Sequence, residues 1–186
     1  MADVFENAMF DPRTGSAIVA TELNELRLQI ISNMYAQNAV ASGNTIRSLK
    51  VIQEPFSARL VSQQKMPFGV LETGRRGGKI PYGFAGIIYE WMQKKGIHAE
   101  PIPYKDGKTH KFTEQERADR SMASAIAKTI SRSGTRLFRQ GGRDTIYSQD
   151  VQKTIDKCRE RLSAFLFVAA KESIKLNIKN TKIGRR

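Results

Sequence analysis

The chain has 186 residues, 40% of them hydrophobic and 26% charged, and it contains a single cysteine, Cys158. This composition is that of a globular protein large enough to bury a core, and one cysteine excludes an intramolecular disulfide and a multi-cysteine metal site. The longest apolar run, 164–170, is far shorter than the roughly 20 residues of a membrane span. Because the N-terminal sequence is acidic and lacks the basic region of a secretory signal, we expect a protein made in a cytosol, without a membrane partner.

The net charge of +13 is unevenly distributed along the chain. Residues 1–60 carry a net charge of −1, so the remainder carries +14. A field of that size attracts polyanions at moderate ionic strength. We therefore expect contact with nucleic acid that does not read its sequence. The alternative is a solvated basic surface that only keeps the protein soluble.

The first 40 residues are predicted to form an arm followed by a helix. Residues 1–16 show no clear period, which is typical of an N-terminal arm that is disordered or docked on a neighbouring subunit. From about Thr21 to Val40, apolar residues recur at helical spacing. Thr21 is the predicted N-cap, and Gly43 lies beyond the C-terminal end.

A strand hairpin and a glycine-rich loop are predicted next. Residues 50–53 and 56–61 alternate partially between apolar and polar side chains, and the proline at Glu54-Pro55 favours a turn between two strands. Residues 67–81 are rich in glycine and basic side chains, which is typical of a mobile loop.

Two helices are predicted after this loop, each with its own end signals. The first covers residues 84–95 and ends at Gly96. The second begins with the capping box of Thr113 and Glu116 and is stopped by Gly134. Their predicted apolar faces are Phe84, Ile87, Ile88, Trp91 and Met92 in the first helix, and Ala118, Met122, Ala125, Ile126 and Ile130 in the second.

The rest of the chain is predicted to be an irregular stretch, the clearest helix and a basic tail. Residues 135–147 are irregular, with a strand around 136–138, and the tail covers residues 177–186. The last helix begins near Ser148. Its apolar stripe consists of Val151, Ile155, Cys158, Leu162, Phe165, Leu166 and Ala169. Cys158 is thus expected to be a buried structural thiol rather than a reactive one.

Together these elements predict an α+β fold. Three or four helices are expected to pack on a small, mostly antiparallel sheet, with a long C-terminal helix. A single domain is expected over residues 17–176.

No residue pattern indicates catalysis, a metal or a cofactor. The two histidines, His98 and His110, lie in one proline-bounded segment without metal-ligand spacing. A nuclease would suit the charge. However, its candidate carboxylates Glu54, Glu72 and Asp106 lack acidic partners at a spacing that would hold a magnesium ion. We therefore expect a protein that is not an enzyme and that needs no metal or cofactor.

The best candidate contacts are basic side chains on either side of the glycine-rich loop. The segment 74–79 lacks the Ser or Thr that a phosphate-binding P-loop carries after its lysine. Its cations are expected to lie along a phosphate backbone or, with equal weight, to belong to a loop ordered by a neighbouring subunit. A second basic set continues past Gly134. The candidate DNA or assembly contacts are Arg75, Arg76, Lys79, Arg136, Arg139 and Arg143.

One stretch of the sequence resembles a known family. Residues 42–51, Ser-Gly-Asn-Thr-Ile-Arg-Ser-Leu-Lys-Val, follow a predicted helix and lead into a strand. Gly-Val-Leu-Glu-Thr-Gly at 69–74 comes about twenty residues later. This order resembles the tail-completion, or neck, proteins of tailed bacteriophages, in which a helix, a Leu-Arg-containing turn, a hairpin and a Glu-x-Gly loop precede further helices. The resemblance covers residues 20–95.

The resemblance implies a structural function in a virion. Such a protein would be one subunit of a ring of six or twelve copies, twelve being slightly favoured, between portal or adaptor and tail proteins. Genomic double-stranded DNA would pass through the ring, and the subunit would be made in the host cytoplasm. The residues by themselves leave two other functions open: a nucleic-acid-binding protein that does not read sequence, and a small nuclease.

Overall fold

The computed structural model describes residues 12–63, 68–104 and 111–183, without the side chains of Pro12 and of residues 180–183. The single domain expected over residues 17–176 stays a prediction, and by its internal contacts the chain divides into two compact units. Unit 1 consists of Met1–Asn33, Arg47–Gln63 and Tyr147–Arg186, and unit 2 of Met34–Ile46 and Gln64–Ile146.

Helices dominate the described chain, and its two strands form one antiparallel sheet, so the predicted α+β class is confirmed. The short helical segments α3, α4 and α7 were not predicted. In chain order the elements are α2 (Pro12–Ala36), α3 (Asn44–Ser48), β1 (Leu49–Glu54), β2 (Ser57–Ser62), α4 (Val70–Thr73), α5 (Phe84–Lys95), α6 (Glu114–Ser133), α7 (Arg136–Arg139) and α8 (Ser148–Ile183).

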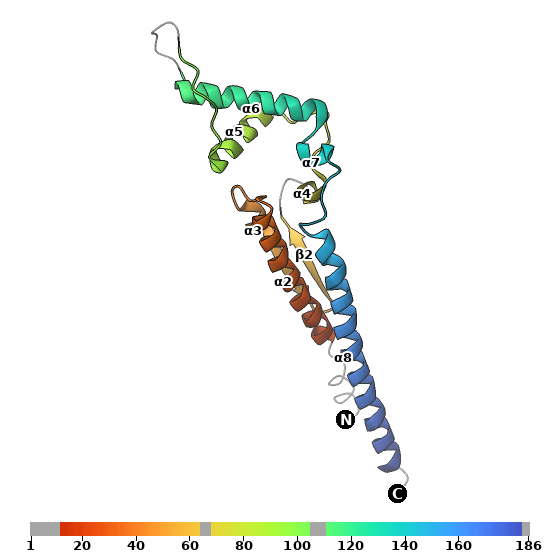
Figure 1. The fold of residues 1–186 in the computed structure, drawn as a ribbon. Coiled ribbons are helices and arrows are strands. Elements are labelled where there is room, and N and C mark those ends of the chain that lie inside the picture. The colour runs from red at the N-terminus through yellow and green to blue at the C-terminus, as the bar shows by residue number, and fades with distance from the viewer. Residues whose placement is uncertain (1–11, 64–67, 105–110, 184–186) are drawn as a thin grey trace. The chain divides into compact units, whose positions relative to one another are not determined.

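In unit 1, α2 and α8 run antiparallel beside the strand hairpin (Figure 1). The Asn33 side-chain amide donates to Asp150 at 2.8 Å near the start of α8. Further along α8, Arg161 forms an ion pair with the buried Glu22. Residues later in α8 therefore contact residues earlier in α2, as expected for two antiparallel helices.

The predicted hairpin is confirmed. Glu54 on β1 pairs with Ser57 on β2, which leaves Pro55 and Phe56 as the two-residue turn. The hairpin is tied to α2 by the Arg27 guanidinium, whose Nε donates to the carbonyl oxygen of Leu49 at 3.0 Å. The sheet of this fold is therefore part of unit 1 and contacts α2.

Helix α2 begins earlier and ends earlier than predicted. Residues 12–16, predicted as the end of the arm, form its first turn, and the rest of that arm lies outside the described residues. The first residue is a proline, which suits a helix start because no intrahelical partner is needed there. Thr21, the predicted N-cap, lies inside the helix and donates its hydroxyl to Ala17 O at 3.0 Å. The helix ends at Ala36 instead of Val40.

Helix α8 begins at the predicted residue but continues further. Residues 177–183, predicted as part of the basic tail, are helical. Of the predicted stripe, Ile155 and Leu166 are exposed because α2 covers only one side of the helix. The half-buried members are Val151, Cys158, Leu162, Phe165 and Ala169. Cys158 was predicted to be buried and is half-buried. Burial raises the pKa of its thiol, as does the charge of Glu22.

In unit 2, α5 and α6 pack against each other between the predicted end signals. Thr113 Oγ1 accepts the N–H of Glu116 at 3.1 Å, which confirms the N-terminal cap of α6. Gly96 and Gly134 are the C-caps of α5 and α6, as predicted. Local sequence signals thus determine where these helices start and stop.

The buried faces of α5 and α6 differ from the predicted ones. On α5, Ile87 is 53% exposed and Trp91 39% exposed. On α6, Met122 is exposed, and the buried positions are Ala118, Asp119, Ala123 and Ala127. The physical reason is a buried polar side chain on α6. The Asp119 carboxylate accepts the N–H of Ala99 at 2.7 Å, and this hydrogen bond fixes which face of α6 turns inward.

Candidate nucleic-acid interface

The glycine-rich segment after α4 is held against the corner between α6 and α7. The Arg75 N–H donates to Thr135 Oγ1 at 3.0 Å, and the Thr135 N–H donates back to Arg75 O at 2.9 Å. The Gly78 N–H donates to Ser131 O at 2.7 Å, and the Ser131 hydroxyl donates to Gly78 O at 3.1 Å. A segment predicted to be a mobile loop is therefore fixed by paired hydrogen bonds to residues more than fifty positions away.

Two glycines allow this close approach. A Cβ on Gly74 would lie 2.4 Å from the backbone nitrogen of Phe138, and one on Gly134 would lie 2.7 Å from Arg75 O. Both glycines also have positive φ angles, 69° and 77°, which other residues adopt only with strain. No other residue type fits either position without backbone movement.

Residues 136–138, predicted as a strand, instead belong to helix α7. Thr135 is the N-cap of this helix, and its Oγ1 accepts the Phe138 N–H at 3.3 Å. The same oxygen accepts the N–H of Arg75, so one threonine both starts α7 and holds the loop. The sequence signal was a Thr three residues before Phe138, which is capping spacing.

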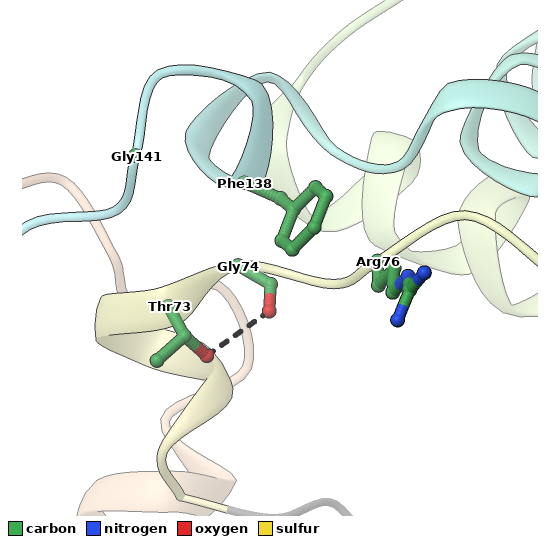
Figure 2. A pocket seen from close by; sticks show the side chains of 5 residues that line it. All are labelled: Thr73, Gly74, Arg76, Phe138 and Gly141. Carbon is green, nitrogen blue, oxygen red and sulfur yellow. Dashed lines mark hydrogen bonds between the residues drawn. The ribbon is translucent and has the colours of Figure 1, made fainter.

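The loop and α7 form an open hollow of about 370 Å³. Figure 2 shows the Phe138 ring over the loop between Gly74 and Arg76. Thr73 and Gly141 complete the lining. Phe138 is 39% exposed and Arg76 is exposed, so an aromatic ring and a guanidinium are presented together.

Exposed cations lie on the two segments that are joined beside this hollow, and one of them, Arg76, lines it. They lie on segments 74–79 and 131–139, which the hydrogen bonds above join and which contain no acidic residue. We call this set the basic corner: Arg76, Lys79, Arg132, Arg136 and Arg139, all exposed. Cations gathered without interspersed carboxylates attract a polyanion more strongly than the same number spread among acids.

Two of the six predicted contact residues have structural roles. Arg75 is half-buried, with its guanidinium 5.0 Å from the centre of the Phe84 ring. Arg143 is also half-buried. Its side-chain Nε donates to Leu71 O at 3.0 Å, and its backbone N–H donates to Glu72 O at 2.8 Å. Arg143 thus satisfies backbone carbonyls of α4.

The two described carboxylates considered for nuclease chemistry, Glu72 and Glu54, are each held by another partner. Glu72 is buried in unit 2, where its Oε1 accepts the Ile146 N–H at 2.9 Å. Glu54 belongs to unit 1 and pairs with Arg59 at 2.6 Å. Asp106 lies outside the described residues. In the ranges that the structure describes, no group of three or more His, Cys, Asp or Glu side chains is arranged to hold a metal ion.

His98 contacts the buried acid of α6. Its Nδ1 lies 3.0 Å from Asp119 Oδ2, while half of its side chain stays exposed. This hydrogen bond and the N–H of Ala99 hold the pKa of Asp119 well below its usual value. His98 therefore helps to fix the α5–α6 pair. His110 lies outside the described residues.

No protein-family model matches the chain, and no curated protein or solved structure is significantly similar to it. Within residues 12–63, 68–104 and 111–183, no helix combines the length and apolar character needed to cross a membrane. Function is therefore inferred from the residues of the two units.

Proposed function

We propose that this protein is a structural subunit of a virion neck or tail ring, which joins portal or adaptor proteins to the tail around the DNA passage. The observation that carries the proposal is the basic corner. Its cations lie beside Phe138 on a backbone held by hydrogen bonds and glycines. Such a surface suits the phosphate backbone of passing DNA, because phosphate contacts carry no base sequence information.

Exposed apolar side chains favour a protein that assembles with other chains over one that acts as a monomer. In unit 2, Tyr82 is fully exposed and Ile87 is 53% exposed. In unit 1, Phe167, Ile174 and Ile178 are 70%, 60% and 53% exposed. Contiguous exposed apolar surface marks protein–protein contacts. A ring subunit would bury this surface against its neighbours.

The proposal is tested by counting copies in purified virus particles with quantitative peptide mass spectrometry. About six or twelve copies per particle are expected, since a closed ring has a fixed number of subunits. Native mass spectrometry of the purified chain at high concentration gives the corresponding ring mass. A chain that is abundant in infected cells but missing from the particles would contradict the proposal.

The basic corner also favours a second candidate, a nucleic-acid-binding protein that does not read sequence and acts as a monomer or dimer. The two candidates differ in assembly. A binder would bind DNA with a steep salt dependence while remaining a monomer or dimer in native mass spectrometry. A ring subunit would form the closed oligomer.

A further inference from the structure

The distal half of α8 carries an apolar stripe that faces away from α2. Phe167, Ile174 and Ile178 are all more than half exposed, and at 100° per residue they fall within about 40° of one another around the helix. We call these three residues the distal stripe. Leu162 and Phe165 are half-buried. They lie roughly 190° around the helix from the centre of the distal stripe, which is the opposite side of α8.

The side of α8 that carries Leu162 and Phe165 is the one that meets α2. Leu162 lies 3.8 Å from the position of a Cβ on Gly15, and both leucine and glycine line an apolar hollow with Phe165. Because the helices are antiparallel, the start of α2 is level with Phe165. Helix α8 continues for about 27 Å beyond that level. Nothing in the described part of unit 1 covers the distal stripe.

The charges beside the distal stripe indicate which kind of segment can bind it. Lys171 and Lys175 lie along one edge of the stripe, and both are exposed. Lys175 also pairs with Glu172 at 2.7 Å. Two α8 helices pairing through this stripe would bring like charges together, which opposes that contact. A segment that combines apolar and acidic side chains fits instead.

The chain itself contains such a segment in residues 1–11. It has the apolar residues Val4, Phe5, Met9 and Phe10, the acids Asp3, Glu6 and Asp11, and no lysine or arginine. Eleven residues span about 16 Å as a helix and more if extended, which matches the spacing from Phe167 to Ile178, about 16 Å along α8.

We propose that residues 1–11 of one copy bind along the distal stripe of a second copy, an inference that rests on the proposed ring. The segment that binds the distal stripe is expected to come from a second copy. In the same chain, residues 1–11 lead into α2, which packs on the side of α8 opposite to the distal stripe. Pro12 also opposes a straight helical continuation at the residue before it. Binding of one surface to a different surface of the next copy is the heterologous contact from which rings are built.

Cysteine crosslinking between two chains tests the inference. In a Cys158→Ala background, a tagged chain with Phe5→Cys is mixed at high concentration with an untagged chain with Ile174→Cys, and a short bismaleimide is added. A crosslinked heterodimer is expected on a denaturing gel. The matched control is Leu176→Cys, on the opposite side of α8, which should crosslink at least about tenfold less because the segment does not reach that side.

A charge exchange provides a second readout. Lys171→Glu with Lys175→Glu should weaken crosslinking by about tenfold, as expected for close charge pairs. Asp3→Lys with Glu6→Lys in the tagged chain should restore it. Failure of that rescue would overturn the charge assignment.

The outcomes separate this inference from the proposed function. Rings without the Phe5–Ile174 crosslink would overturn the inference and leave the ring proposal intact. A crosslink confined to one chain, seen when both cysteines are in the same molecule but never after mixing, would also overturn it. Neither a crosslink nor a ring at high concentration would overturn both.

Discussion

Two acidic side chains of unit 2, Asp119 and Glu72, are buried and accept backbone hydrogen bonds. Asp119 accepts the N–H of Ala99, and Glu72 accepts that of Ile146. Buried carboxylates are tolerated only when such donors replace water. Both residues are therefore packing residues, and one of them had been a candidate for metal binding.

Asp119 should make the stability of unit 2 depend on pH. Its folded-state pKa is depressed, first by the His98 hydrogen bond and then by the Ala99 N–H. The stabilisation is therefore present above the ordinary aspartate pKa of about 3.9 and is lost as pH falls below that value. Asp119→Asn should lower the melting temperature by several degrees at pH 7, and the difference from wild type should shrink in acid.

Thermal unfolding followed by circular dichroism from about pH 7 down to about pH 2 measures this effect, because the stabilisation begins to fall below the ordinary aspartate pKa. The control is Asp156→Asn, because Asp156 is exposed on α8, where it pairs with the exposed Arg159 at 3.6 Å and accepts the side-chain amide of Gln152 at 3.2 Å. A difference between Asp119→Asn and wild type that stays constant across this range would contradict the prediction.

Gly134 should be irreplaceable for steric reasons beyond its backbone angle. Gly134→Ala places a Cβ 2.7 Å from Arg75 O at φ 77°, whereas Gly83→Ala has φ 75° and no atom within 4 Å. Gly83→Ala carries the left-handed strain of about 1–2 kcal/mol. Gly134 combines φ 77° with ψ −179°, a backbone region that glycine alone adopts readily, so its strain is at least as large. Only Gly134→Ala adds a clash, so its loss in urea unfolding should be larger by at least about 1 kcal/mol. Equal losses would mean that the loop moves freely away from Gly134.

At the scale of elements, short helices join segments that are distant in the sequence. Helix α7 has a single turn, yet its N-cap Thr135 bonds to the loop at Arg75. Likewise, the Arg143 side chain bonds to Leu71 in α4. These two contacts hold α4, the loop and α7 as one structure that presents the basic corner.

Thr135→Val should release this structure, because valine keeps the shape of threonine but offers no oxygen to the N–H groups of Phe138 and Arg75. The expected loss is about 0.5–1.5 kcal/mol in urea unfolding, the usual net contribution of a hydrogen bond, because the Arg75 donor is partly buried and the Phe138 donor is exposed. Thr135→Ser keeps the hydroxyl and should lose less than half as much. Equal losses for the two variants would show that the hydroxyl is not what holds the loop.

At the scale of the whole molecule, charge is the property most directly linked to the proposed function. The net charge is +13, and the residues after 60 supply all of the positive excess. Total charge sets general attraction to DNA, while local arrangement sets the number of phosphates contacted. Variants that lose equal charge at different places can separate the two effects.

The triple variant of Arg76, Arg136 and Arg139 to alanine should reduce the salt dependence of DNA binding. Each lost phosphate contact lowers the slope of log affinity against log salt by about 0.9, so a total of roughly 3 is expected. Fluorescence anisotropy with a labelled duplex, measured from about 50 to 200 mM salt, gives the slope. Lys153, Lys157 and Arg159 to alanine is the control, because it removes the same charge from α8. Equal slopes for both triples would contradict a specific role of the basic corner.

The sequence by itself determined the parts of this protein that depend on neighbouring residues. The limits of α5, the caps of α6 and the hairpin at Pro55 follow from glycine, threonine and proline acting on their own backbone. Most of the basic candidates also occupy two short segments that contain no acidic residue.

Only the tertiary structure decided which of those residues remain available. The inward face of α6, the fixed loop at Arg75 and the structural role of Arg143 depend on hydrogen bonds between residues 20 to 72 positions apart. The pattern of apolar residues does not encode such bonds, because a buried carboxylate or guanidinium becomes acceptable only when a distant donor or acceptor meets it. For that reason the candidate cations could be predicted from the sequence, whereas the tertiary structure determines which of them are exposed to solvent.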